Sequence, residues 1–188
     1  MKVTILEFPD DKAWLGVKQR ALVTVGLNAV NPPDEEWKRK MLTCRHSPIR
    51  YLRFSFYLED VPSYVSVHLT RHKHAEPYVK SQRNDRQQDY DRTKAPQDAP
   101  VNMIWDLTGE ELLIVMNKRL CGQADIKTQE LMHMIRDAII ERDPMYRAFL
   151  VPMCIYMGKC PEVFKKECSS VYFKKYVPQM RKIELTEE

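Results

Sequence analysis

An alternating run of apolar residues in the first third of the chain restricts the fold more than any other feature. Within positions 51–58, the residues Leu52, Phe54, Phe56 and Leu58 alternate with mostly polar neighbours. Because successive side chains of a strand point to opposite faces, this run predicts a strand with one buried face. Helical patterns flank it on both sides along the chain, so the sequence indicates an α+β fold.

Periodicity and capping residues predict the remaining elements. Thr108, with Glu111 three positions later, forms a capping box at the start of a helix. Residues 72–102 are polar and interrupted by prolines, which is typical of a long functional loop. No repeat or linker-like stretch is found, so we expect one domain over 1–188, with 165–188 as its C-terminal tail. The other expected elements are a strand over 2–7, a helix over 12–27 in which 23–25 is equally compatible with a strand, and helices over about 31–42, 62–71, 112–120 and 125–141.

Composition excludes several classes of protein. Glycine is scarce, with 5 in 188 residues, and neither GxGxxG nor GxxxxGK[ST] occurs. A Rossmann or P-loop site is therefore excluded, and any phosphate must be held by side chains. The net charge of +4 is too small to predict a nucleic-acid partner. No apolar stretch approaches the ~20 residues of a membrane span and no secretory signal is visible, so we expect no membrane partner and a cytoplasmic location.

Two groups of residues have a spacing that partly suits a metal ion. His68 and His72 lie four residues apart, as in some zinc sites, but Leu69 occupies the position at which the HExxH pattern needs Glu; a basic helix end that faces a ligand is the alternative. The other group is spaced more widely than the usual C-x2–4-C pairs, so we expect free reduced thiols there and no metal site. That group consists of Cys154, Cys160 and Cys168, with Cys121 as a fourth candidate.

The densest concentration of basic and polar residues lies between positions 67 and 83. Arg71-His72-Lys73 is followed after seven residues by Ser81-Gln82-Arg83, and Arg92 and Arg119 are further basic candidates. Guanidinium groups are suited to bidentate recognition of phosphate and carboxylate groups. The pattern predicts a pocket for an anionic ligand. The alternative is a solvated basic face that is paired with the nearby acids Glu76, Asp85, Asp89 and Asp91.

This spacing resembles the RHRx7S motif of the flavin-dependent thymidylate synthases, the ThyX family. The strand at Phe54-Ser55-Phe56 and the helix that leads through His68 resemble the family's elements before that motif, and Arg119-Leu120-Cys121 resembles its LR.C run. The resemblance covers about residues 1–165. It implies a single ThyX-like α+β domain with a mixed or antiparallel sheet packed with helices, assembled as a homotetramer with shared active sites.

The resemblance also implies an activity and the roles of individual residues. The family methylates dUMP reductively at C5, using methylenetetrahydrofolate, FAD and NADPH, and the flavin supplies the difficult chemistry. Arg119 would stabilise negative charge on the uracil carbonyls. Carried over by position, the catalytic residues are Arg119 and Ser81, the residues for dUMP are His68, Ser81, Gln82, Arg83, Arg92 and Arg119, and those for FAD or folate are Arg71, His72, Lys73 and Tyr51.

Several positions depart from the family pattern, mostly on the flavin side. Lys73 replaces an Arg, Tyr51 replaces a flavin-contacting His, and Thr108 and Glu110 stand where an Asn-x-Arg pair is expected. The stretch from Arg83 to Arg92 is also shorter than the family's helical insertion. Two alternatives therefore accompany the methylation hypothesis: a divergent enzyme that modifies a related pyrimidine nucleotide, and a non-catalytic protein that binds nucleotide or nucleic acid and has lost FAD.

Overall fold

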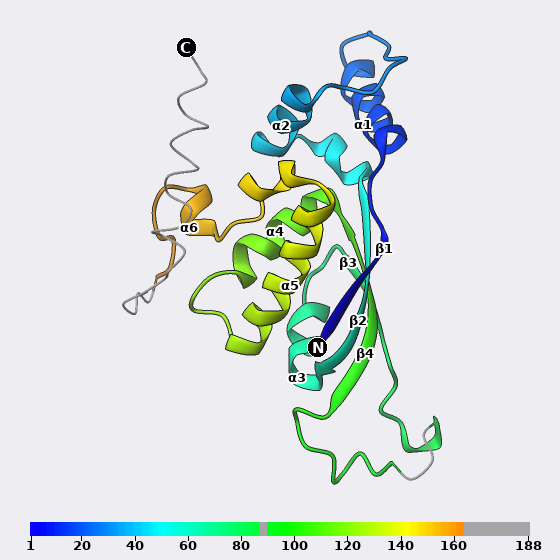
Figure 1. The fold of residues 1–188 in the computed structure, drawn as a ribbon, viewed down its shortest axis with the longest axis vertical. Helices are drawn as coiled ribbons and strands as arrows, with labels where there is room; N and C mark the ends of the chain where they lie inside the picture. Colours follow the sequence, from blue (N-terminus) through cyan, green and yellow to red (C-terminus); the bar gives the residue numbers. More distant parts are fainter. Residues whose placement is uncertain (87–89, 164–188) are drawn as a thin grey trace.

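The computed structural model describes residues 1–86 and 90–163, which form a sheet with helices against one of its faces (Figure 1). The elements, in chain order, are β1 (Lys2–Glu7), α1 (Asp11–Val23), α2 (Glu35–Thr43), the 3-10 helix η1 (Ser47–Tyr51), β2 (Arg53–Pro62), α3 (Ser63–Thr70), β3 (Ala75–Val79), the 3-10 helix η2 (Asn84–Arg86), β4 (Pro100–Thr108), α4 (Gly109–Arg119), α5 (Ile126–Arg142), the 3-10 helix η3 (Pro144–Ala148) and α6 (Met153–Tyr156).

All four strands pair antiparallel, in the order β1-β2-β4-β3. The predicted alternation in β2 is confirmed, because Phe54, Phe56 and Leu58 are buried while Arg53 is exposed and Tyr57 is half-buried. The strand β4 has the same alternation, with its buried side chains packed in the same core. The α+β fold expected from the sequence is therefore confirmed, with a purely antiparallel sheet.

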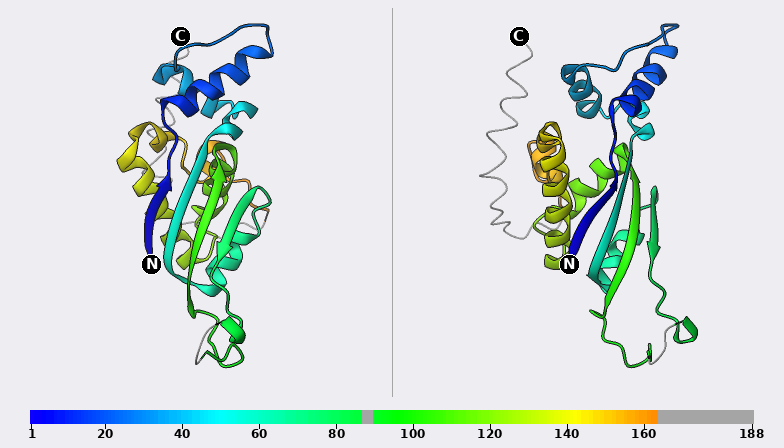
Figure 2. Two further views of the ribbon diagram at one scale, coloured as in Figure 1. Left: turned by 90° about the vertical axis from the view of Figure 1, so that its right-hand side faces the viewer. Right: turned by 45° about the vertical axis from the view of Figure 1, so that its right-hand side comes forward.

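The helices α3, α4 and α5 cover one face of the sheet, and α1 and α2 lie beyond its end near η1 (Figure 1). Figure 2 shows the opposite face of the sheet, against which no helix of the described residues packs. Tyr57, Ile104 and Tyr78 are register partners across β2, β4 and β3 on that face. This bare face therefore carries half-buried and exposed side chains, whereas the alternate residues of β2 and β4 pack into the core on the other face.

Three sequence-based expectations about elements are wrong. The helix expected over 12–27 ends at Val23, because Gly26 adopts a left-handed φ of 73° that stops the helix, and 23–25 does not form a strand. Tyr51 belongs to η1 rather than to the strand, which begins at Arg53. The 72–102 stretch is a loop only over part of its length.

Two strands occupy the ends of that stretch. In β3, Pro77 lacks an N–H and is tolerated because β3 is an edge strand. In β4, the alternating apolar residues begin at Val101 and continue to Leu107 just before the helix cap, so the strand runs directly into α4. In the described part of the chain, the loop proper is confined to residues 80–86 and 90–99 and includes the short η2.

Side-chain caps mark the helix starts, and the helix expected over about 31–42 begins only at Glu35, because Asp34 is its cap. Asp34 accepts a hydrogen bond from the amide of Trp37 at 2.8 Å, Thr108 accepts one from Glu111 at 3.2 Å, and Asp125 caps α5 through Thr128. The helix expected over 62–71 is observed as α3. Among the described helices, none has the length and apolar character needed to cross a bilayer.

Candidate functional site

The short helix α3 connects the two parts of the candidate site. Tyr64 and His68 lie four residues apart and therefore on the same helical face, and their rings form an edge-on contact with centroids 6.0 Å apart. The imidazole Nδ1 of His68 lies 2.9 Å from the hydroxyl of Thr128 on α5. At the start of α3 the Tyr64 amide donates to the carbonyl of Gln97 in the loop, whereas near the other end the carbonyl of His68 accepts from Arg119 of α4.

At the α4 end, three side chains and one backbone carbonyl form what we call the buried cluster: the side chains of His72, Glu111 and Arg119, and the carbonyl of His68. The Nε atom of Arg119 lies 3.1 Å from Nε2 of His72, and one of its terminal nitrogens donates to the carbonyl of His68, also at 3.1 Å. Glu111 places a carboxylate oxygen 3.3 Å from Nδ1 of His72. The side chains of His72 and Glu111 are each only 5% exposed, so these contacts are largely shielded from solvent.

The donors of this cluster determine the protonation state of His72. A guanidinium has only N–H donors, so Nε2 of His72 must accept from Arg119. The ring is then neutral and carries its proton on Nδ1, which points at the Glu111 carboxylate. The Glu111 carboxylate therefore faces a neutral imidazole at 3.3 Å, and the contact is not an ion pair between two full charges.

Electrostatics support a neutral His72. Burial, followed by the positive charges of Arg119 and Lys118, lowers the pKa of His72 to about 4. Burial also raises the pKa of Glu111, a shift that the nearby charges of His74 and Lys118 oppose. At neutral pH the cluster therefore consists of a fixed guanidinium, a neutral imidazole and a buried carboxyl group.

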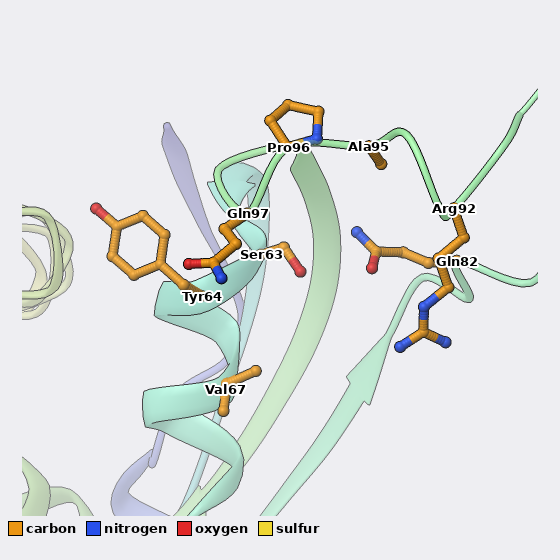
Figure 3. A pocket seen from close by; sticks show the side chains of 8 residues that line it. All are labelled: Ser63, Tyr64, Val67, Gln82, Arg92, Ala95, Pro96 and Gln97. Atoms are coloured by element: carbon orange, nitrogen blue, oxygen red, sulfur yellow. The ribbon is translucent and has the colours of Figure 1, made fainter.

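At the other end of α3, a pocket of about 280 Å³ opens between the helix and the loop (Figure 3). In that view the Gln82 and Arg92 side chains lie next to each other, and the Gln82 amide points toward α3. The first amides of α3 are not available to a ligand, because Ser63 and Tyr64 donate to the carbonyls of Ala99 and Gln97. Recognition in this pocket therefore depends on side chains. Its lining consists of Ser63, Tyr64, Val67, Gln82, Arg92, Ala95, Pro96 and Gln97.

We call residues 80–86 and 90–99 the exposed segment. Arg83 forms a bidentate contact with Asp85, at 2.8 and 2.6 Å, and both side chains are about 60% exposed. The Ser81 hydroxyl accepts from the backbone amide of Arg83 at 3.3 Å. Within the described residues, no hydrogen bond or ion pair occupies the Arg92 guanidinium. In this arrangement Arg83 is paired locally, whereas Arg92 is available to a ligand.

Arg71, Lys73 and His74 form the exposed rim of the turn that follows α3. Neither Arg71 nor Lys73 forms an ion pair with any residue in the described part of the chain. Between them, His72 turns inward to the buried cluster. The basic triplet that the sequence singled out is thus divided, with one buried ring and two exposed charges.

Tyr51 lies apart from the other predicted site residues. Its ring packs directly on Gly16, where even one added carbon would collide with it, and the Arg20 guanidinium lies 3.5 Å from the ring centre. The ten residues of β2 separate Tyr51 from the start of α3, a span of about 30 Å at the usual rise per strand residue. A single chain therefore does not bring Tyr51 to the pocket.

Near Tyr51, Glu110 forms two hydrogen bonds with Arg50, at 2.6 and 3.2 Å. The two side chains are 22% and 63% exposed, respectively, so the pair lies at the surface of the α4 start. The carboxylate of Glu110 is thereby neutralised at the position where the family resemblance leads one to expect a cation.

The described residues contain no group of three or more potential ligands placed to hold a metal ion. His68 and His72 do not converge on a common point, because Thr128 engages the first ring and Arg119 with Glu111 the second. Cys160 is an exposed free thiol, and Cys121 and Cys154 are half-buried. Cys168 lies outside the described residues.

Glu111 is the site residue that sequence reasoning missed. The capping-box pattern explained it fully as the third helical residue, and that cap is present. Its carboxylate, however, lies against His72, which is 39 positions earlier in the sequence. The Glu111 side chain is nearly as buried as the core residues. Because a buried carboxylate needs a polar partner, its burial indicates a second role, but burial is known only from the structure.

Comparisons with known proteins give the fold a name. No family model and no curated protein matches the chain. A crystal structure of Thymidylate Synthase X (ThyX) from Helicobacter pylori with FAD and dUMP is similar at 14% identity, over 73% of this chain and 93% of that chain, with a TM-score of 0.59. A second structure of the flavin-dependent enzyme from Helicobacter pylori, also with FAD and dUMP, is similar at 13% identity, over 79% and 99%, with a TM-score of 0.64. The chain therefore has the fold of ThyX.

Proposed function

We propose that this protein is a thymidylate synthase of the flavin-dependent type, which binds dUMP and methylates it at C5. The arrangement of Arg119 carries the proposal: two fixed acceptors, on His72 and His68, orient its guanidinium beside the helix whose other end lines the pocket. The likeness to structures that hold FAD and dUMP supports the same class of ligand. Preorganised donors of this kind are the most effective means of stabilising a developing negative charge.

In this proposal the pyrimidine nucleotide lies along α3. Gln82 and Arg92 line the pocket and would hold the phosphate and sugar, with Ser81 and Arg83 beside them. Arg119 would meet the uracil carbonyls, because its Nη1 group has no hydrogen-bond acceptor among the described residues. His68 would contribute through the carbonyl that orients Arg119.

The positive charges at the 71–74 turn are complementary to an anionic dinucleotide cofactor. Arg71 and Lys73 are exposed and have no acidic partner within the described residues, so they suit the diphosphate of FAD. Bound there, FAD would supply the redox chemistry, with NADPH and methylenetetrahydrofolate as sources of electrons and of the one-carbon unit. Tyr51 would bind the cofactor only from a neighbouring copy.

Assembly into a homotetramer with shared active sites is part of the proposal. The separation of about 30 Å between Tyr51 and the pocket supports it, because a site that uses both needs a second chain. The bare face of the sheet offers a surface for such an assembly (Figure 2).

A second candidate is a protein that binds the nucleotide without FAD. The contacts of Glu110 with Arg50, and of Tyr51 with Gly16 and Arg20, favour it, because they occupy residues on the flavin side. Such a protein would keep the pocket and the buried cluster, and would act on another pyrimidine nucleotide or on none.

The test combines the visible absorption spectrum of the purified protein, before and after addition of FAD, with calorimetric titration of dUMP. We expect a bound-flavin spectrum and saturable dUMP binding. Arg92→Ala should weaken dUMP binding at least about tenfold, because it removes a charged donor from the pocket. Lys94→Ala, which removes an exposed positive charge two residues away, should change it less than about twofold.

Each other outcome has a distinct meaning. A colourless protein that binds dUMP would select the second candidate. A protein that binds no dUMP, or an Arg92→Ala variant with unchanged affinity, would overturn the assignment of the pocket.

A further inference from the structure

Glu111 occupies a position from which it controls the orientation of Arg119 without reaching any ligand itself. We propose that Glu111 is a positioning residue: its carboxylate fixes the Nδ1–H tautomer of His72, and His72 in that tautomer holds the Arg119 guanidinium in place for the pyrimidine nucleotide. The ligand in this inference is that of the proposed function, but the tautomer is a property of the protein alone.

The first step is the pairing of donors and acceptors at His72. Arg119 donates to Nε2 at 3.1 Å, so that nitrogen has to be an acceptor. Glu111 lies 3.3 Å from Nδ1 and offers only acceptor oxygens when ionised, so that nitrogen has to be a donor. The two neighbours therefore demand the same tautomer from opposite sides of the ring.

The second step is the fate of the ring without the carboxylate. A neutral imidazole with no acceptor at Nδ1 leaves a buried N–H unsatisfied, which is costly. Moving the proton to Nε2 removes that cost but sets two donors, Nε2–H and the Arg119 Nε–H, against each other. Arg119 then has to turn away, and one of its two fixed acceptors is lost. A carboxylate behind a histidine sets the tautomer in this way in other proteins.

The third step is the rigidity of the backbone around the ring. The amide of His72 donates to the carbonyl of Leu69, and its own carbonyl accepts from Ala75, both at 3.2 Å. The imidazole therefore has little freedom to move away from Arg119, and a change of tautomer must be accommodated by Arg119 instead. Glu111 is equally fixed, because its own amide is bonded to the cap residue Thr108.

The position of Glu111 in α4 keeps its carboxylate available despite burial. It lies in the first turn of the helix, where the helix dipole favours negative charge. His74 and Lys118 also lower its pKa, against the effect of burial. The neighbouring acid, Glu110, is engaged by Arg50 and does not compete for His72.

The test records long-range ¹⁵N–¹H correlation spectra of the histidine rings in the intact protein and titrates dUMP by calorimetry. The wild type should show the Nδ1–H tautomer for His72, assigned by comparison with His72→Gln. Glu111→Met, which removes the acceptor and keeps much of the volume, should move the proton toward Nε2 and weaken dUMP binding about tenfold. Glu111→Gln, whose amide oxygen still accepts, should lie between the two.

Glu110→Gln is the matched control, since it removes one charge from the same helical turn. It should leave both the His72 tautomer and the dUMP affinity unchanged. An Nε2–H tautomer in the wild type, or an unchanged tautomer in Glu111→Met, would overturn the inference; the wild-type spectrum decides this even if Glu111→Met does not fold. A protein that binds no dUMP would overturn the proposed function, while the tautomers would still decide the role of Glu111.

Discussion

The buried cluster and the exposed segment recognise a ligand in different ways, although the sequence motif joins them within a few residues. In the buried cluster, His72 and Glu111 are about 5% exposed and each contact spans two different elements of the fold. In the exposed segment, Arg83 is 60% exposed and its partner Asp85 lies two residues away. One region is organised by the fold, and the other by its own neighbours in sequence.

The two regions therefore have different roles in binding: the buried cluster orients Arg119, and the exposed segment forms new contacts with the ligand. Arg119 is already held in place in the folded protein. A ligand that binds to the buried cluster therefore costs little additional side-chain entropy. The exposed segment has to exchange local contacts, such as that between Arg83 and Asp85, for contacts with a ligand. Substitutions in the buried cluster should therefore affect stability and binding together, and those in the exposed segment binding alone.

The largest effect should come from removing the guanidinium of the buried cluster. Arg119→Met leaves His72 Nε2 and the carbonyl of His68 without their donor, so the free energy of unfolding should fall by about 3 kcal/mol. Urea denaturation followed by circular dichroism measures this change.

Arg83→Met is the matched variant in the exposed segment. Its loss of an exposed ion pair should change the free energy of unfolding by less than about 0.5 kcal/mol. Equal losses of stability in both variants would show that the two regions do not differ in the way described.

A smaller effect should appear in the pH dependence of stability. The unfolded chain protonates His72 near its ordinary pKa of 6.5, whereas the folded protein keeps the ring neutral down to about 4. Protons therefore bind the unfolded state more tightly within this window, and the free energy of unfolding falls as the pH is lowered through it. His72→Gln removes this contribution and leaves Glu111 in place.

The measurement is urea denaturation of the wild type and of His72→Gln between pH 7 and pH 4. The wild type should be the more stable at pH 7. The difference in free energy of unfolding between the wild type and His72→Gln should narrow by about 2 kcal/mol toward pH 4. If this difference in free energy of unfolding stays constant, His72 has the same pKa in the folded and unfolded states. That result would contradict its burial against Arg119.

The smallest effect should come from freeing Arg83. Asp85→Asn removes the carboxylate that holds the guanidinium, so under the proposed function dUMP affinity should rise about twofold to threefold. Stability should not change measurably. Asp98→Asn, another exposed acid of the same segment, controls for the change in net charge; a weaker affinity in Asp85→Asn alone would show that Asp85 orients Arg83 for the ligand.

The elements that could be predicted from the sequence are those with local signals. The β2 strand follows from its alternation, α4 from its Thr108 cap, and α5 from the helical spacing of its apolar residues. The strand β3 was missed because Pro77 and its polar neighbours resemble a loop, and a short edge strand needs few apolar residues. The strand β4 was missed although Val101, Met103, Trp105 and Leu107 alternate; the preceding polar stretch obscured that signal.

The candidate site could be predicted only in part, for a related reason. The basic residues were identified from their type and spacing, but which of them are buried depends on contacts between distant parts of the chain. His72 meets Arg119, 47 positions away, through the packing of α3 against α4. Glu111 already had a local explanation as a cap residue, so nothing in the sequence pointed to a second role.

The pairing of β2 with β4 has a consequence for how such a protein can change. Because Pro62 is the register partner of Pro100, residues 63–99 form an insert whose ends the central ladder holds together. The entropy of closing a flexible loop grows only with the logarithm of its length, so doubling the exposed part of this insert would cost about 0.6 kcal/mol. The exposed segment is thus free to lengthen or shorten and so to vary the ligands it captures, while the packing of α3 on α4 sets a fixed frame around Arg119.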